Sequence, residues 1–216
     1  KERIVGDFDS FVAERRPAGT TVRWINVDGL GDLNVVHKLA EKYGLHPLAV
    51  EDMMHLPQRP KVDVYEAGGQ HHARLFIVAH MIQRLDGRVR AEQVSLFLGK
   101  NTVITFLEDP GDVWEVIRQR LRHAGSPMRA FDASFLVYAL IDAIVDHCFP
   151  LLEHYNDRLI RLEEMVMKGA RQEIIQHIYR EKRDLLLLSR QIWPMREVVN
   201  TLLRDEYPHM SAFTRT

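Results

Sequence analysis

The sequence predicts an α+β fold in which an α/β region is followed by a long antiparallel helical hairpin. Helix and strand signals alternate up to about residue 125, and two long runs of apolar residues at helical spacing follow. A short loop centred on Gly169 joins these runs, and helices joined by so short a loop pack antiparallel. We therefore expect an α/β domain over residues 1–128 and the hairpin over residues 129–216.

The first elements are recognised by the residues at their ends. We expect a strand at residues 22–27, a helix at residues 32–43 and a short helix at residues 47–54. Asp32 can act as the N-cap of the first helix, and Gly44 can end it in the left-handed conformation. Pro47 fits the first turn of the second helix, where a missing N–H loses no partner.

A β-rich stretch extends from Val62 to Leu107. Its predicted strands are at residues 74–83, 89–98 and 102–107. Asp86-Gly87 predicts a tight hairpin turn between the first two strands, and residues 99–101 predict a second turn. Asp112 is then expected to cap a helix that ends near His123.

Each of the two long helical runs contains a proline. The first run spans residues 132–168, and its apolar pattern continues past Pro150, so we expect one bent helix rather than two. The second run spans residues 171–204 and should be kinked at Pro194. An apolar stripe with steps of three and four follows the second run and is broken only by Glu181. Its members are Ile174, Ile178, Leu185, Leu188, Ile192, Met195, Val199 and Leu202.

Composition excludes several classes of protein. Hydrophobic residues make up 46% of the chain, enough for a buried core, and the formal net charge of -1 gives no drive toward nucleic acid. The single cysteine, Cys148, excludes an internal disulfide and fits a reducing compartment. The most apolar stretch, residues 135–152, is interrupted by Asp142 and Asp146, so we expect a soluble helix there. Because the chain begins at Lys1 without a leader, we interpret it as a piece of a longer protein.

The sequence contains none of the common catalytic motifs. Gly29-Leu30-Gly31 begins like a dinucleotide fingerprint, but Asn34 stands where the third glycine belongs. The phosphate-binding Gly-Lys-Ser/Thr loop, the Gly-x-Ser-x-Gly elbow and the His-Glu-x-x-His pair are missing. We therefore expect that the protein is not an enzyme.

Acidic residues form a stripe on the first long helix. At about 100° per residue the stripe lies opposite the apolar face. It consists of Asp142, Asp146, Glu153, Asp157 and Glu164. A divalent cation could offset the repulsion between these carboxylates, since hard cations prefer oxygen ligands. A solvated face neutralised by nearby Lys and Arg is the alternative.

A second acidic point is Glu51-Asp52, on the short helix that begins at Pro47. The two side chains point about 100° apart, so one could bind a metal directly and the other through water, or both could face solvent. His46 and His55 flank this helix and are expected to cap or orient it. His71 and His72 sit beside a strand, where neighbours face opposite ways, and we interpret them as surface residues.

Read in order, several fragments resemble the CorA family of divalent-metal channels, over about Trp24 to Asp205. The fragments are Trp24-Ile25-Asn26-Val27 with Gly29, His46-Pro47-Leu48 with Glu51-Asp52, Gln58-Arg59-Pro60-Lys61, Glu92-Gln93-Val94-Ser95, Leu140-Ile141-Asp142-Ala143 and Trp193-Pro194-Met195-Arg196-Glu197. Each fragment alone is weak, and their common order and spacing carry the resemblance.

The resemblance implies an α/β/α sandwich with a mixed sheet, on the cytoplasmic face of the inner membrane. The family protein is a homopentamer that senses intracellular Mg²⁺ through carboxylates between subunits and gates magnesium transport. By this resemblance Asp52 is the main regulatory carboxylate, and Glu51 and Asp142 contribute to a neighbouring site. The acid that pairs with Asp52 lies on the stalk helix of the next subunit in the family. By the resemblance, that position and the pore helices that enter the membrane would lie beyond Thr216. The implied cofactor is regulatory Mg²⁺, with Co²⁺ or another divalent cation as the alternative.

Two other functions remain open at this point. One is the cytosolic domain of a related zinc transporter, although hard oxygen ligands suit magnesium better than zinc. The other is a soluble scaffold protein built on the helical hairpin.

Overall fold

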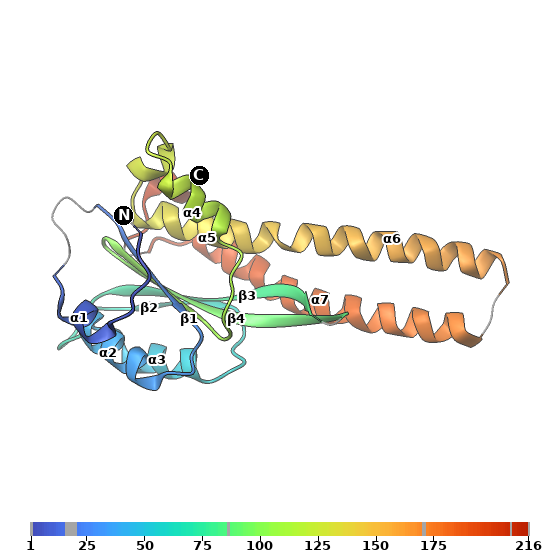
Figure 1. Cartoon of the computed structure of the whole chain (residues 1–216), viewed down its shortest axis with the longest axis horizontal. Helices are drawn as coiled ribbons and strands as arrows, with labels where there is room; N and C mark the ends of the chain where they lie inside the picture. Colours follow the sequence, from blue (N-terminus) through green and yellow to red (C-terminus); the bar gives the residue numbers. More distant parts are fainter. Residues whose placement is uncertain (1, 16–20, 86, 170–171, 208, 216) are drawn as a thin grey trace.

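The computed structural model describes residues 2–15, 21–85, 87–169, 172–207 and 209–215. Figure 1 shows a three-layer body from which two long helices run out side by side to a distant tip. The predicted α+β fold, an α/β/α sandwich with a mixed sheet and a long helical hairpin, is confirmed.

The central sheet has five strands in the order β1-β5-β4-β3-β2. Their bounds are β1 Arg23–Asp28, β2 Lys61–Tyr65, β3 Arg74–Leu85, β4 Arg88–Gly99 and β5 Thr102–Leu107. β1 pairs parallel with β5, and the other pairs are antiparallel, so the sheet is mixed. The β3–β4 hairpin is in register from Leu75 opposite Leu98 to Leu85 opposite Arg88. In its predicted turn, Asp86 lies outside the described residues and Gly87 has φ +76°.

Alternate residues of the strands face two separate cores. One face of the sheet packs against three helices, α1 Phe8–Ala13, α2 Leu33–Tyr43 and α3 Pro47–Met54. The predicted ends of α2 are confirmed. The Asp32 carboxylate accepts from the N–H groups of Asn34 and Val35, and Gly44 has φ +57°. Pro47 opens α3 as expected, whereas α1 has no counterpart in the sequence prediction.

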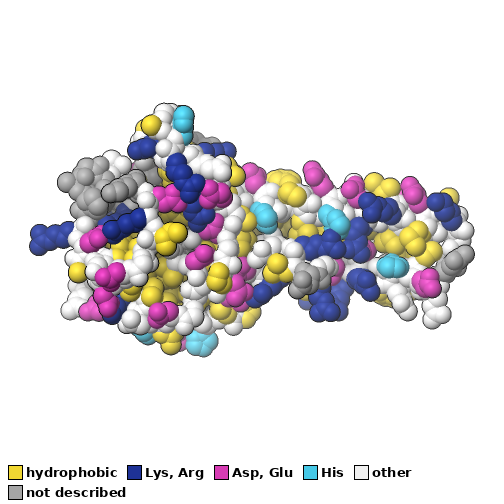
Figure 2. Space-filling model, in the orientation of Figure 1, with side chains coloured by type: hydrophobic (Ala, Val, Ile, Leu, Met, Phe, Trp, Pro, Cys, Tyr) yellow, Lys and Arg dark blue, Asp and Glu magenta, His cyan; other side chains and the backbone are white. Residues whose placement is uncertain are grey.

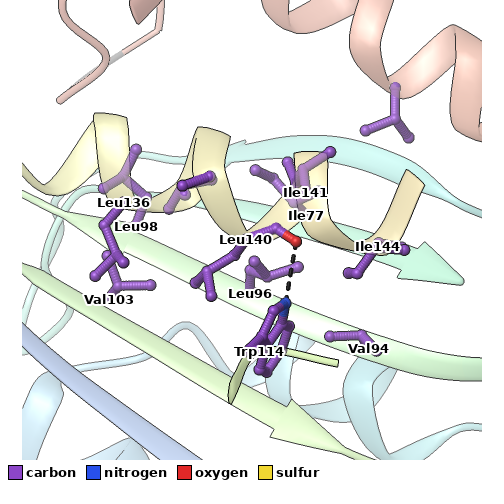
Figure 3. Close-up of a cluster of buried hydrophobic side chains, with 14 of the residues drawn as sticks. Ile77, Val94, Leu96, Leu98, Val103, Trp114, Leu136, Leu140, Ile141 and Ile144 are labelled. Atoms are coloured by element: carbon purple, nitrogen blue, oxygen red, sulfur yellow. Dashed lines mark hydrogen bonds between the residues drawn. The ribbon is translucent and has the colours of Figure 1, made fainter. Parts of the chain in front are cut away.

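The opposite face of the sheet is covered by helices from the second half of the chain. These are α4 Glu115–Arg122, α5 Ala133–Asp146 and the C-terminal part of α7 Gln172–Arg204, with short 3-10 turns η1 Pro127–Ala130 and η2 Ala212–Arg215 beside them. Figure 3 shows α5 lying across the strands, with its apolar side chains pointing onto the sheet. The Trp114 indole is fully buried in this core and donates to the Leu140 carbonyl at 3.0 Å.

The domain boundary predicted at residue 128 stays a prediction. Both α5 and the end of α7 follow that position in the chain and still belong to the core of the sandwich. The helices that extend away from the sandwich are α6 and the first part of α7 (Figure 1).

Asp112 is not the helix cap that the sequence predicted. α4 begins at Glu115, and its N-cap position is Trp114, which makes no side-chain capping bond. The Asp112 carboxylate accepts from the Trp114 N–H at 2.9 Å, just before the helix begins, and also from Arg118 Nη1 at 2.8 Å and from Asn26 Nδ2 at 3.0 Å. The charge-assisted bond from Arg118 and the bond from Asn26 together tie α4 to β1.

The first long helical run is two helices rather than one bent helix. α5 ends at Asp146 and α6 spans Cys148–Met167, with His147 between them. Pro150 is the third residue of α6. The first N–H groups of a helix have no partner within the helix, so the missing N–H of proline costs no hydrogen bond there. The break therefore lies about one turn before the proline. The stretch Ala133–Met167 is the one part of the described chain long and apolar enough to cross a membrane. Its first half, α5, buries Leu136, Val137 and Leu140 against the sheet.

The hairpin of α6 and α7 contains a buried ion pair. Glu181, expected to break the apolar stripe of α7, is only 2% exposed and pairs with Arg158 of α6. Beside it, Tyr155 donates to the buried carboxylate of Asp184 at 3.2 Å. Ile174, Leu188, Met195 and Leu202 of the predicted stripe are buried, whereas Ile178 is 43% exposed near the tip. α7 is continuous through Pro194, and the kink predicted there stays a prediction.

Glu92 on β4 is a buried carboxyl group that faces the β5–α4 loop. It is 1% exposed and accepts from the Asp109 N–H and from Gln83 Nε2, each at 3.0 Å. Burial raises the pKa of Glu92, and the nearby charges of Asp109 and Glu108 add to the increase.

Replacing Glu92 by glutamine is expected to remove part of the pH dependence of stability. The pKa of Glu92 is higher in the folded chain, so the folded state binds its proton more tightly and loses that advantage as pH rises through the folded pKa. The wild type should therefore lose stability relative to Glu92→Gln as the pH rises from about 4, below the ordinary carboxyl pKa, to about 8. Thermal unfolding of both proteins at these two pH values checks this. A difference that does not change with pH would count against the buried carboxyl.

Candidate metal site

Helix α3 places Glu51 and Asp52 at the edge of the sandwich. Ala49 and Met53 anchor the helix on the sheet, since both are almost fully buried. Glu51 is exposed, and the Asp52 side chain is 29% exposed. Neighbouring helical residues point about 100° apart, so the two carboxylates are available in different directions.

The Asp52 carboxylate already binds a cation, the ammonium group of Lys61. Lys61 Nζ lies 2.7 Å from Asp52 Oδ2 and 2.7 Å from Asp63 Oδ2. Lys61 and Asp63 are two residues apart on β2, so their side chains leave the same face of this edge strand. Burial opposes the charge of Lys61, but the bonds to both carboxylates outweigh it and raise the pKa of the ammonium.

A buried glutamine holds α3 and the start of β2 in this arrangement. Gln93, 3% exposed on β4, accepts from the Gln58 N–H at 2.7 Å and donates to the Met53 carbonyl at 3.4 Å. His80 Nε2 lies 2.8 Å from the Gln58 carbonyl on the other side. The segment between Asp52 and Lys61 is therefore fixed from the sheet.

The histidines near this helix differ from the prediction in one case. His46 caps α3, because its Nδ1 accepts from the Leu48 N–H at 3.2 Å. Its ring stacks on that of Tyr65, with the ring centroids 4.6 Å apart. His71 is not a free surface residue. Its ring lies 5.4 Å from that of His46, and its Nδ1 is buried without a hydrogen-bond partner among the described residues. Burial raises the pKa of Tyr65, as do the charges of Asp63 and Asp52.

Asp142 lies on the outer side of α5, exposed to solvent. Partial burial raises the pKa of Asp142, and the carboxylate of Asp146 one turn later raises it further, against the nearby Arg120. The rest of the predicted stripe, Asp146, Glu153, Asp157 and Glu164, is also exposed. Figure 2 shows acidic side chains along the outer edge of α6 with Lys and Arg side chains beside them, as expected of a solvated face.

The structure does not bring the three predicted metal ligands together in one chain. Glu51 and Asp52 lie on α3, below the sheet in Figure 1, and Asp142 lies on α5, above it. Within the ranges that the structure describes, no three His, Cys, Asp or Glu side chains form a group that could hold a metal. Each set of carboxylates needs ligands from elsewhere.

The predicted ligands have the type of donor atom that a hard divalent cation prefers. Glu51, Asp52 and Asp142 offer oxygen ligands, as Mg²⁺ requires, and Mg²⁺ commonly uses only one or two protein carboxylates. The ammonium of Lys61 is a cation already bound by Asp52. The edge formed by α3 and β2 therefore offers carboxylate oxygens, one of which already binds an ammonium group of the same chain.

Two functional candidates were not assigned a role from the sequence. Lys61 and Gln93 both lie in the fragments that carry the family resemblance. The lysine and the aspartate lie two residues apart at the start of the predicted β-rich stretch, shortly after an acidic helix, and this spacing was the available signal for the Lys61 pair. Nothing local to Gln93 indicates that it would contact a helix more than 35 residues earlier.

Comparison with known proteins identifies the family to which the chain belongs. Residues 19–215 match the family model described as "CorA-like Mg2+ transporter protein". The cobalt/magnesium transport protein CorA of Thermotoga maritima is 39% identical over 189 residues, which cover 88% of this chain and 53% of that protein. The putative metal ion transporter YfjQ of Bacillus subtilis is 30% identical over 182 residues, covering 83% of this chain and 53% of that protein. The chain therefore belongs to the CorA-like Mg²⁺ transporter family.

Solved structures show the same fold. The soluble domain of CorA from Methanocaldococcus jannaschii superposes with a TM-score of 0.73 at 17% identity, over 89% of this chain and 74% of that one. The chain spans about half the length of the two curated relatives named above.

Proposed function

We propose that this chain is the cytosolic regulatory domain of a CorA-type magnesium channel. It would sense intracellular Mg²⁺ through Glu51, Asp52 and Asp142, and gate transport by helices outside this sequence. The domain would lie on the cytoplasmic face of the inner membrane, as part of a homopentamer. Family membership and the half-length match to transport proteins support this assignment.

The observation that carries the proposal is the position of the acids on opposite faces of the sheet. In a cyclic ring of identical subunits, one face of each subunit meets the other face of its neighbour. Glu51 and Asp52 of one subunit would then approach the α5 side of the next, which carries Asp142. In such a head-to-tail ring, sites that are incomplete within one chain could be completed by a neighbour.

The proposed mechanism depends on charge between neighbours. Bound Mg²⁺ supplies positive charge that offsets the repulsion between carboxylates of adjacent subunits. Without it, Glu51, Asp52 and Asp142 repel one another across the interface and the domains separate. A coupling of about 1–3 kcal/mol between binding and closure is enough to change the populations of open and closed rings.

Replacing Asp52 or Asp142 by asparagine should weaken magnesium-dependent closure of the full-length transporter. Each change removes a ligand charge and keeps the side-chain shape, so the Mg²⁺ concentration for half-maximal protection against protease should rise about fivefold or more. Asp157→Asn, on the exposed face of α6, is the matched control and should behave as wild type. Unchanged magnesium protection in both variants would remove these residues from the sensor.

The choice of metal can be tested on the same protein. Carboxylate ligands favour Mg²⁺ over Zn²⁺, and the name of the Thermotoga relative makes Co²⁺ the second candidate. Protection titrations with the three ions should rank Mg²⁺ and Co²⁺ ahead of Zn²⁺. Tight protection by Zn²⁺ with none by Mg²⁺ would favour a zinc transporter.

A further inference from the structure

We propose that Lys61 is a tethered cation that competes with the regulatory metal for Asp52, and that Asp63 holds the Lys61 ammonium when the metal displaces it. This inference rests on the proposed function, because it concerns the regulation of the same carboxylate. It assigns roles to two residues that the resemblance does not mark as ligands.

Geometry places the ammonium between two alternative acceptors. Lys61 Nζ binds Asp52 Oδ2 and Asp63 Oδ2 at the same distance, 2.7 Å. The side chains are 32%, 29% and 38% exposed for Lys61, Asp52 and Asp63, so solvent screens these bonds only in part. A metal that takes Asp52 does not leave Lys61 without a partner, since the bond to Asp63 remains.

The backbone keeps both partners of Lys61 in place. Lys61 and Asp63 share one face of β2, which is paired with β3 from Lys61 opposite Val78 to Tyr65 opposite Arg74. Asp52 is fixed by the packing of α3 and by the bonds of Gln93 to both ends of the connecting segment. The lysine side chain is the flexible part, and its movement from two acceptors to one needs no change in the fold.

This arrangement has a consequence for metal affinity. A cation at Asp52 must displace one ammonium bond and then tolerate the positive charge of Lys61 nearby. The metal affinity of the site is therefore set below what the carboxylates alone would give, which suits a sensor that must release its metal when the free concentration falls.

The test is a double-mutant cycle on magnesium-dependent protease protection of the full-length transporter. Lys61→Met should lower the half-maximal Mg²⁺ concentration by about threefold to tenfold, because the competing charge is gone. Asp63→Asn should raise it, because the ammonium then binds Asp52 alone. In the Lys61→Met background, Asp63→Asn should have no further effect. Lys38→Met is the matched control, because Lys38 on α2 is an equally charged lysine that pairs with Asp9 of α1. It should leave the titration unchanged.

The outcomes separate this inference from the proposed function. If Asp52→Asn abolishes protection but Lys61→Met leaves the midpoint unchanged, the competition is overturned and the sensor stands. If Asp63→Asn weakens binding equally with and without Lys61, Asp63 acts on the metal directly and its proposed role is wrong. If Asp52→Asn itself has no effect, the proposed function fails.

A second measurement covers the case in which Lys61→Met fails to fold. Amine-reactive labelling of the wild-type protein, read by mass spectrometry, should show more reaction at Lys61 with Mg²⁺ than without it, relative to Lys38. Equal labelling in both conditions would contradict displacement.

Discussion

Replacing Trp114 by alanine is expected to destabilise the domain by about 3–5 kcal/mol. The Trp114 side chain is 0% exposed and fills the space between the sheet and α5. Its ring forms a T-shaped contact with that of Trp24, and the two ring centroids lie 5.7 Å apart. Its indole N–H also donates to the Leu140 carbonyl at 3.0 Å. The substitution leaves a cavity and removes that hydrogen bond. Because α5 carries Asp142, the Trp114→Ala substitution should also loosen the α5 side of the candidate metal site.

Thermal or urea unfolding measures this effect, and the chain contains its own control. Trp193 on α7 is 61% exposed, so Trp193→Ala removes the same side chain from the surface. That control should change stability by less than about 1 kcal/mol. Equal losses in the two variants would contradict the packing described for Trp114.

Replacing Arg158 by methionine is expected to destabilise the hairpin by about 3–5 kcal/mol. Arg158 is the cation that pairs with Glu181, whose side chain is 2% exposed. Glu181 Oε2 has no hydrogen-bond partner within the part of the chain that the structure describes, so the carboxylate depends on that one ion pair. Without Arg158 the charge of Glu181 stays buried and uncompensated.

The double variant Arg158→Met/Glu181→Leu should recover the lost stability, because replacing a whole buried pair by apolar residues is often neutral or stabilising. Hydrogen exchange of α6 and α7 is the proper readout, since the hairpin extends away from the main core and can open locally. Arg183→Met, at an exposed position of α7, should not change the exchange rates. A double variant less stable than Arg158→Met would contradict this account, because removing the uncompensated charge of Glu181 should raise the stability of the hairpin.

Much of the fold follows from local patterns in the sequence. Asp32, Gly44 and Pro47 mark helix ends through backbone chemistry that acts within a few residues, and all three predictions are confirmed. The strands of the long hairpin follow from their β-rich composition and the Asp-Gly turn signal. The parallel pairing of β1 with β5 joins segments far apart in the chain, and no local pattern encodes it.

Two charged residues show what local patterns leave out. Asp112 was expected to cap a helix, but its carboxylate also binds Asn26, 86 residues earlier. Glu181 interrupts the apolar stripe of α7 in the sequence, and a partner on α6 allows its burial. In both cases a charged residue has a tertiary partner, and the sequence alone does not show which partner it finds.

The candidate site shows the same limit. The carboxylates Glu51, Asp52 and Asp142 were selected from the sequence and the resemblance, and their role stays a prediction. Their positions on opposite faces of the sheet became visible only in three dimensions, as did the Lys61 ammonium between Asp52 and Asp63.

Cross-linking between subunits tests the central claim most directly. Cysteines at positions 51 and 142, introduced as Glu51→Cys and Asp142→Cys in a Cys148→Ser background of the full-length transporter, can be joined by a short bismaleimide reagent. If the two faces meet in a ring, the double variant should form a ladder of linked chains, and each single variant should stay unlinked. The account predicts that this ladder extends to five subunits, and a double variant that remains monomeric under the same conditions would contradict it.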